Sequence, residues 1–405
     1  MSMSKQKVVV QNTAPEQQHL GFEEAVNLGS FYTPPHLVDA AYAMLAQHIK
    51  HVADYTILDT SCGYGSFLRS KNGSHNSGSS KTIGGDIDSI ALQQAAALNT
   101  SAHVCNQNGL VRVMRNKYAI AQDEKLIIVG NPPYNDTTSI IRRAVKHGGS
   151  VTDADLRARD LGLSFLLSYN KLHADYVCVL HPLSYLIKKT NFRILSPFAK
   201  NYRLLDSVVV SSGEFAQASK TTQFPIILAL YERVHSRNHV EQSQFGMDYD
   251  FIENYRFKTI DGKSWSLSRM TAISRYIAKY PNKERVSLED AMAFFWTMRD
   301  INALKRTKTF IATESTNTLR VTQDDFAYYC YVDIFKDYIK HLPYYFGNCN
   351  VFIASLEFER VKREFVQAAC AKHRFLAKYA HAARAPYAPK LDAYFRELLG
   401  VHYVD

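Results

Sequence analysis

Residues 127–134, Ile-Ile-Val-Gly-Asn-Pro-Pro-Tyr, join a short aliphatic run to groups that can do chemistry. The aliphatic residues predict the end of a buried strand. The two prolines lack an N–H and fix their φ angles, so they predict a stiff turn directly after that strand. In this turn the side-chain oxygen of Asn131 and the carbonyl of Pro132 can accept both N–H bonds of an amino group, and the Tyr134 ring can stack on a plane. The turn therefore suits a planar group that carries an –NH2 substituent.

A loop with two glycines follows another short apolar stretch, at residues 57–68. The pattern predicts a strand that ends at Asp59, a loop with Gly63 and Gly65, and a helix start, which together bring backbone N–H groups close to a ligand. A dinucleotide-binding loop would carry a third glycine where this sequence has Leu68. The carboxylate of Asp59 disfavours a phosphate and favours a cation or an ammonium group.

Acidic residues end the next predicted strand, at residues 83–86. Asp86 lies about 20 residues past the glycine loop, which is the spacing at which an acidic residue takes ribose hydroxyls in a mononucleotide-binding unit. Asp88 is expected to cap a helix that starts at Ser89. A third short strand is expected within residues 104–110, and the side chain of Asn108 at its polar end can meet an adenine edge.

The elements that must position these residues alternate between strand and helix from about residue 30 to residue 233. Thr33 is expected to cap a helix with Pro34 at its first position. A further helix is expected over residues 153–173, and strands are expected at residues 176–182, 204–210 and 224–230, the last two as a possible hairpin. The alternation predicts a doubly wound α/β domain.

Two flanking regions differ from this domain. Residues 1–28 are polar and predict an N-terminal arm, and the polar stretch at residues 233–244 predicts a domain boundary. Residues 240–405 are rich in aromatic side chains, and residues 355–384 are expected to be helical. Basic residues are interleaved with the aromatics: Arg299, Lys305, Arg306, Lys308, Arg320, Lys336 and Lys340. This mixture suits base stacking and phosphate contacts, although core aromatics beside a solvated face would give the same pattern.

The composition sets wider limits. The formal net charge is +10, which fits a polyanionic partner but also serves solubility. The 6 cysteines are scattered without a close pair, which favours a reducing compartment over a disulfide framework, and we expect no metal site. No run approaches 18 apolar residues and we find no signal peptide, so we expect no membrane association.

Four sequence stretches, in order, resemble a known family: FYTPPHLV (31–38), ILDTSCGYGSFL (57–68), IGGDID (83–88) and GNPPY (130–134). They resemble the γ-class, TaqI-like adenine-N6 DNA methyltransferases over about residues 29–233. The resemblance implies a Rossmann-like, doubly wound mixed sheet of the class I methyltransferase type. It also implies a catalytic domain at residues 29–235 that binds S-adenosylmethionine, and a second, C-terminal target-recognition domain at residues 240–405.

The resemblance also implies a role for each matching residue. The expected cofactor-binding residues are Phe31, Thr33, Asp59, Ser61, Gly63, Asp86 and Asn108. Asn108 stands where the family usually has an aspartate, so its contact with the cofactor's adenine stays open. The expected catalytic and substrate-binding residues are Asn131, Pro132, Pro133, Tyr134 and Phe215, with Phe224 as the alternative to Phe215.

The implied activity is methylation of a flipped adenine in double-stranded DNA, by a bacterial or phage modification enzyme of the cytoplasm. This leaves open a cognate restriction endonuclease on a separate chain. Protein glutamine methyltransferases share the Asn-Pro-Pro-Tyr motif, so a glutamine substrate is one alternative, and RNA adenine is another. A catalytically idle DNA-binding or interaction protein that keeps the fold is the third. The Thr-Pro-Pro element and the long C-terminal region favour DNA as the substrate.

Overall fold

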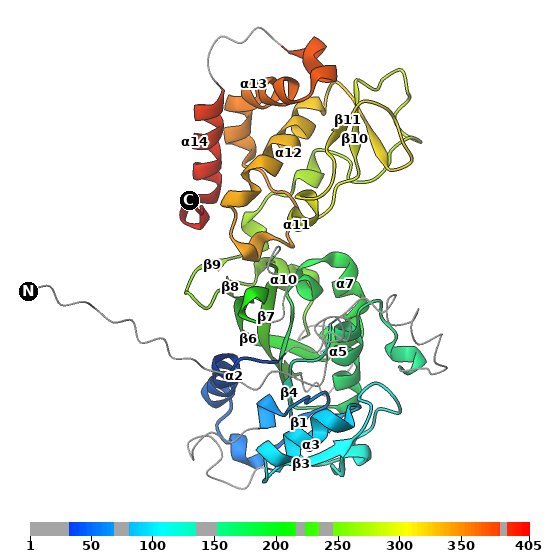
Figure 1. Ribbon diagram of the computed structural model, residues 1–405, viewed down its shortest axis with the longest axis vertical. Coiled ribbons are helices and arrows are strands. Elements are labelled where there is room, and N and C mark those ends of the chain that lie inside the picture. The colour runs from blue at the N-terminus through cyan, green and yellow to red at the C-terminus, as the bar shows by residue number, and fades with distance from the viewer. Residues whose placement is uncertain (1–31, 69–80, 135–151, 216–222, 235–245, 381–386) are drawn as a thin grey trace, which may run out of the picture.

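The computed structural model describes residues 32–68, 81–134, 152–215, 223–234, 246–380 and 387–405. These residues form two parts that lie end to end (Figure 1). The N-terminal part, up to residue 234, is built around a mixed β-sheet, and the C-terminal part, from residue 246, is mainly helical with two small sheets. Within these described ranges, no helix is both long and apolar enough to cross a membrane. The predicted N-terminal arm, residues 1–28, lies outside them.

The sheet of the N-terminal part has 7 strands in the order β3-β2-β1-β4-β5-β7-β6. They are β1 (Thr56–Asp59), β2 (Thr82–Asp86), β3 (His103–Asn106), β4 (Leu126–Gly130), β5 (Tyr176–Pro182), β6 (Tyr202–Ser211) and β7 (Pro225–Arg233). The first five strands pair in parallel, whereas β7 runs antiparallel to both β5 and β6. Strand β4 is buried along its whole length, as expected where helices cover both faces of a sheet. The doubly wound mixed sheet and its closing hairpin are therefore confirmed.

Helices flank this sheet (Figure 1). They are α2 (Pro35–His48), α3 (Ser89–Leu98), α5 (Leu161–Leu172), α6 (Ser184–Ile187), α7 (Lys189–Ile194) and α8 (Ser196–Ala199). Short 3-10 turns lie at η1 (Val52–Asp54), η2 (Ser66–Leu68), η3 (Arg115–Tyr118), η4 (Ala154–Leu156) and η5 (Ser212–Glu214). The predicted cap of α3 is confirmed, because the Asp88 carboxylate accepts the N–H groups of Ile90 and Ala91 at 2.9 and 3.1 Å.

Two predicted helix starts are wrong. Helix α2 begins one residue late, with Pro34 as the N-cap, and Thr33 does not cap it. Since a residue before proline is disfavoured in the helical region, Pro34 stays extended at ψ 142°. Helix α5 begins at Leu161 rather than near residue 153, because Asp160 caps it by accepting the Gly162 N–H at 3.0 Å.

The C-terminal part combines short strands with three longer helices. Its elements are α10 (Tyr249–Asn254), β8 (Phe257–Lys258), β9 (Ser264–Trp265), η6 (Leu267–Arg269), η7 (Ile273–Arg275), β10 (Ala293–Trp296), α11 (Ile301–Leu304), β11 (Phe310–Ile311), β12 (Thr318–Val321), α12 (Phe326–Tyr338), η8 (Ile339–His341), η9 (Tyr344–Phe346), α13 (Ser355–Lys372), η10 (Arg374–Tyr379), α14 (Ala388–Leu399) and η11 (Gly400–His402). The helix predicted over residues 355–384 ends early, because His373 turns out of it and places its Nε2 3.0 Å from Oδ1 of buried Asp333.

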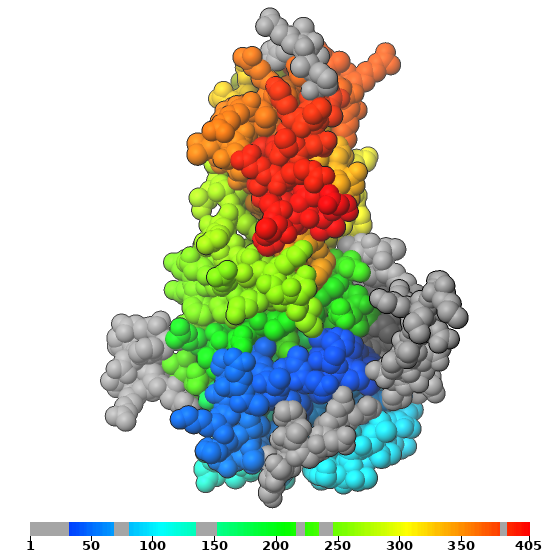
Figure 2. Space-filling model, turned by 90° about the vertical axis from the view of Figure 1, so that its left-hand side faces the viewer, coloured from blue at the N-terminus to red at the C-terminus, as the bar shows by residue number. Residues whose placement is uncertain are grey.

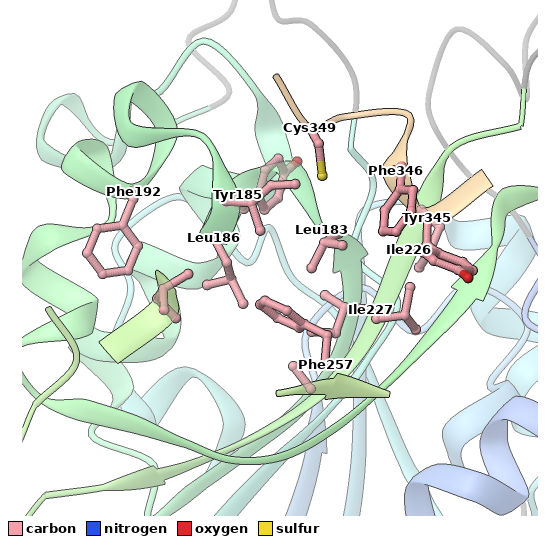
Figure 3. Packing of buried hydrophobic residues seen from close by; sticks show 14 of the residues in the cluster. Leu183, Tyr185, Leu186, Phe192, Ile226, Ile227, Phe257, Tyr345, Phe346 and Cys349 are labelled. Atoms are coloured by element: carbon pink, nitrogen blue, oxygen red, sulfur yellow. The ribbon is translucent and has the colours of Figure 1, made fainter. Parts of the chain in front are cut away.

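A continuous hydrophobic core joins the two parts (Figure 3). The labelled side chains come from both sides of the junction: Leu183, Tyr185, Leu186, Phe192, Ile226 and Ile227 from the N-terminal part, and Phe257, Tyr345, Phe346 and Cys349 from the C-terminal part. The carbonyl of Val209 in β6 accepts the Ile260 N–H at 3.1 Å and the Tyr344 hydroxyl at 3.2 Å. On the face shown in Figure 2, yellow-green residues of the C-terminal part lie between the green residues below them and the red C-terminal residues above. This contact holds the C-terminal part in one orientation.

Candidate active site

The site is assembled where parallel strands β1, β2 and β4 end at the same edge of the sheet. This edge brings Asp59, Asp86 and Gly130 together although they are far apart in the sequence. Gly130 has a φ of +148°, and a Cβ there would lie 2.8 Å from Oδ1 of Asp59. Only glycine lets the turn after β4 pass this close to the carboxyl group. The two sequence motifs are therefore in direct contact.

Asp59 is 2% exposed, and its Oδ1 accepts the backbone N–H of Ser61 at 3.1 Å. Burial raises the pKa of this carboxyl group to about 8; the Ser61 N–H opposes that rise and the negative charge of Asp86 adds to it. Because the charged form is disfavoured without a cation nearby, this carboxyl group is suited to an ammonium ligand, which would lower its pKa again.

Asp86 ties the glycine loop to the second strand. Its Oδ2 accepts the Gly63 N–H at 2.8 Å, and its Oδ1 accepts the Asp88 N–H at 2.9 Å. Gly63 has a φ of +51°, in the left-handed region that favours glycine. Burial raises the pKa of Asp86, while these backbone donors lower it. Each carboxylate oxygen has a second lone pair, so Asp86 can accept a ligand hydroxyl as well.

Three buried hydroxyl groups surround Asp59. They belong to Thr60 and Ser61 in the loop after β1 and to Tyr169 in α5, and they lie close enough for Thr60 and Ser61 to act on the pKa of Tyr169. Within the part of the chain that the structure describes, none of the three makes a hydrogen bond of ordinary geometry. Buried hydroxyls are normally bonded, so this group is available to polar atoms of a ligand.

The turn after β4 lies against the start of α5. Asn131 and Pro133 are half-buried, Pro132 is buried, and Tyr134 is 8% exposed. Burial and the charge of Asp160 raise the pKa of Tyr134, and a hydrogen bond with the Asn131 side chain lowers it. The Tyr134 ring is thus mostly covered, and its hydroxyl end is in contact with Asn131.

Gly162 fixes this contact. A Cβ at Gly162 would lie 2.4 Å from the Tyr185 hydroxyl and 3.1 Å from the Cβ of Tyr134. The Tyr185 hydroxyl in turn donates to Oδ1 of Asp160, the residue that caps α5. Tyr134 therefore packs against a helix start that has no room for a side chain.

We expect Gly162→Ala to lower kcat of the methyl transfer proposed below by about tenfold and to leave the affinity for S-adenosylmethionine unchanged. The added methyl group must displace Tyr185 or Tyr134, whereas Asp59 and Asp86 lie at the ends of β1 and β2, outside α5. Steady-state kinetics and calorimetric titration of the cofactor would measure the two effects. Ala158→Gly, which alters a small residue before α5, is the control. An unchanged kcat in Gly162→Ala would contradict the inferred role.

The other expected cofactor residues are placed as follows. Phe31 lies outside the described residues. Thr33 is buried just before α2, and His36 in the first turn of α2 lies 3.2 Å from Glu214 in η5. Oδ1 of Asn108 accepts the Leu110 N–H at 2.8 Å, so the oxygen that would meet an adenine amino group already binds the backbone.

The two candidate stacking residues differ in exposure. Phe215, which follows η5, is 3% exposed, whereas Phe224 before β7 is half-buried. The Phe224 carbonyl accepts the Ser212 N–H at 2.9 Å, so both aromatics flank the same turn. The structure brings this turn and the first turn of α2 together through His36 and Glu214.

Sequence reasoning missed Tyr169, Asp160, Gly162 and Tyr185 as parts of the site. The periodicity of α5 shows only that its residues are buried, and an internal tyrosine then counts as core. Two features of the sequence could have indicated these residues. One is a tyrosine inside the predicted apolar helix, because its hydroxyl group needs a partner when buried, and the other is a glycine near the start of that helix.

The donor set fits S-adenosylmethionine, by its chemistry and by the unbonded hydroxyls near Asp59. A buried carboxyl group and a second acidic residue match an ammonium group and a ribose, respectively. Residues 18–197 match the family model described as N-6 DNA methylase. This match confirms the resemblance found in the sequence.

Several solved structures that resemble about half of this chain are named as methyltransferases. One is a candidate RNA methyltransferase from Pyrococcus horikoshii (13% identity, TM-score 0.35, 52% of this chain and 89% of that chain covered). Others are TrmN from Thermus thermophilus (17%, 0.32, 49% and 49%) and a type I restriction-modification methyltransferase subunit from Streptococcus thermophilus (14%, 0.37, 51% and 45%). The chain thus spans about half the length of the last two. No curated protein matches the sequence.

Proposed function

Since residues 18–197 match the N-6 DNA methylase family model, we propose that this chain uses S-adenosylmethionine to methylate the N6 amino group of an adenine in duplex DNA. The observation that supports this proposal most strongly is the turn at residues 130–134, held at the end of β4 against Asp59. We also propose that it acts as a bacterial or phage modification enzyme in the cytoplasm, alone or beside a separate endonuclease.

The residues around Asp59 would hold the cofactor. S-adenosylmethionine supplies a methyl group bound to a positively charged sulfur. Asp59 would bind its ammonium group, the loop with Ser61 and Gly63 would hold its methionine portion, and Asp86 would accept the ribose hydroxyls. Thr33 lies close to α2, and we propose that it lines the same pocket from the other side.

The turn after β4 would hold the amine. An adenine inside a duplex is out of reach, so the base must be flipped out at a cost of a few kcal/mol, partly recovered by stacking in the pocket. Oδ1 of Asn131 and the carbonyl of Pro132 would each accept one N–H bond of the amino group, with Pro133 and Tyr134 as the wall beside the base. Two acceptors out of the ring plane draw the nitrogen toward tetrahedral geometry and localise its lone pair.

This mechanism depends on position more than on proton transfer. The lone pair of the amino group is delocalised into the ring, and the two acceptors reverse that delocalisation where the reaction occurs. The amino group becomes acidic only after methylation, so its proton can leave to water. No general base is needed, and we assign none.

The stacking partner of the flipped base can be identified by fluorescence. We propose Phe215 and expect Phe215→Leu, which keeps bulk without the ring, to reduce the fluorescence gain of a 2-aminopurine target on binding by at least half. Phe224→Leu is the matched variant on the same turn. If Phe215→Leu keeps the full gain and Phe224→Leu loses it, the role belongs to Phe224.

The proposed function is tested by transfer of a labelled methyl group to mixed-sequence duplex DNA, digestion to nucleosides and mass analysis. We expect N6-methyladenine with the wild-type chain and none with Asn131→Ala. Parallel reactions with structured RNA and with a protein extract test the alternatives. Label in RNA or in protein glutamine, with none in DNA, would overturn the proposal.

A further inference from the structure

The segment between β10 and β11 carries an excess of positive charge. Its cations are Arg299, Lys305, Arg306 and Lys308, and all four side chains are exposed. In the described part of the chain, none of the four takes part in an ion pair. The acidic residue of this segment, Asp300, has its own partner, since its Oδ2 lies 2.5 Å from Nζ of Lys188. We call these four cations the junction cations.

Several other basic residues of the C-terminal part are occupied by its own structure. Arg320 pairs with Glu314 at 2.7 Å and donates to the Val286 carbonyl at 2.8 Å. Lys336 donates to the Thr307 carbonyl at 2.7 Å. Arg320 and Lys336 therefore bind other groups of the protein. The junction cations form no such ion pairs in the described part of the chain.

The position of these cations is fixed relative to the candidate active site. Helix α11 lies at the end of the C-terminal part that faces the sheet (Figure 1). Asp300 at its N-terminus binds Lys188, which lies between α6 and α7, and Nδ2 of Asn302 donates to the Gln223 carbonyl at 3.2 Å. Gln223 immediately precedes Phe224, so α11 is attached to the turn that carries both candidate stacking aromatics.

A further lysine increases the local charge. Nζ of Lys279 donates to Oδ1 of Asn350 at 2.8 Å, and its backbone carbonyl accepts the Met298 N–H at 3.1 Å, one residue before Arg299. Burial and the charge of Lys188 lower the pKa of Lys279, and Asp300 only partly opposes them. Lys279 therefore adds a positive charge near the junction cations, and in the described part of the chain Asp300 forms its ion pair with Lys188.

We propose that the junction cations bind the phosphate groups of the duplex DNA backbone next to the flipped base. This inference rests on the proposed function, since it assumes a nucleic-acid substrate. Exposed, unpaired cations attached to a rigid element lose few contacts and release counterions when they meet phosphates. Because the junction cations are attached near Phe224, phosphates bound to them would hold the DNA at a fixed position relative to the pocket. Phosphate contacts commonly position a protein on a duplex in this way.

The test uses the full chain and a fluorescein-labelled mixed-sequence duplex, with binding measured by anisotropy across a salt series. We expect the triple variant Lys305→Gln, Arg306→Gln, Lys308→Gln to lower the slope of log Kd against log salt by about 2–3. The control, Arg363→Gln, Arg374→Gln, Lys378→Gln, removes the same charge from α13 and η10, outside the segment between β10 and β11, and is expected to change the slope by less than about 1. Equal slopes in the two triple variants would overturn the inference.

Two further readouts separate this inference from the proposed function. Affinity for S-adenosylmethionine and the unfolding temperature are expected to be unchanged in both triple variants, and Lys308→Glu alone should reproduce the weaker DNA binding if the triple variant is unstable. A wild-type chain that binds DNA through the junction cations but methylates only RNA or protein would overturn the proposed function, and with it the placement of these cations next to a flipped base. A chain that methylates DNA, with binding insensitive to the junction cations, would overturn the inference and keep the proposed function.

Discussion

Replacing Asn131 with alanine is expected to lower kcat for DNA methylation by about 100-fold or more and to leave the Kd of S-adenosylmethionine within about twofold. Removal of one preorganised group that acts at the reacting atom typically costs 100- to 1,000-fold in kcat. Cofactor affinity should be spared because Asp59 and Asp86 lie on β1 and β2 and keep their own hydrogen bonds. Single-turnover methyl transfer and calorimetric titration would measure the two quantities.

Two controls decide whether the effect is chemical or structural. Asn131→Asp keeps an acceptor oxygen in nearly the same place and should retain more activity than alanine. Tyr134→Phe removes the hydroxyl that meets Asn131 but keeps the ring, and we expect a loss of no more than about tenfold. A near-normal kcat in Asn131→Ala would refute the assignment of this side chain as an amine acceptor.

Local sequence signals predicted the parts of the fold that depend on short-range chemistry. The aliphatic run before Asn131 became the buried strand β4, and Asp88 became the cap of α3. Helix boundaries were less accurate. The start of α2 moved by one residue because Pro34 precedes another proline and stays extended, and α13 stopped at Lys372 because His373 contacts a buried aspartate in another helix.

Contacts between distant segments were beyond sequence reasoning. No pattern indicated that Gly130 touches Asp59 or that Gly162 leaves space for Tyr185, because each depends on how the strands and helices pack in three dimensions. The same limit applied to the basic residues of the C-terminal part. Arg320 and Arg306 look equivalent in the sequence, and only the structure shows that Arg320 forms an ion pair with Glu314.

Replacing Asp59 with asparagine is expected to weaken S-adenosylmethionine binding by about 10- to 100-fold at pH 8–9, the effect of losing one charge-assisted hydrogen bond. The loss should depend on pH, since burial raises the pKa of Asp59 to about 8 in the ligand-free protein. At pH 6 the wild-type carboxyl group is protonated and must release its proton to bind an ammonium group. The ratio of variant to wild-type Kd should therefore grow from near 1 at pH 6 to its full value above pH 8.

Calorimetry between pH 6 and 9 would measure this ratio, which cancels the titration of the ligand's own amino group because that group ionises with both proteins. Asp123→Asn, an exposed carboxylate in the turn before β4, is the matched control and should show a ratio near 1 at every pH. A pH-independent loss in Asp59→Asn would contradict a carboxyl group whose pKa is raised.

Asp59→Asn, which is expected to weaken ligand binding, should stabilise the ligand-free fold. An unfolded aspartate ionises near pH 4, whereas folded Asp59 holds its proton up to about pH 8. The folded state therefore binds more protons between these values, so wild-type stability falls as pH rises through this window and levels off above it. Asparagine carries no charge, and Asp59→Asn should raise the free energy of unfolding at pH 8 by up to about 5 kcal/mol in denaturant titrations, with little change at pH 4. If Asp59→Asn has a higher free energy of unfolding and a higher Kd for S-adenosylmethionine than the wild type, the buried Asp59 carboxyl group destabilises the fold but stabilises the bound ligand.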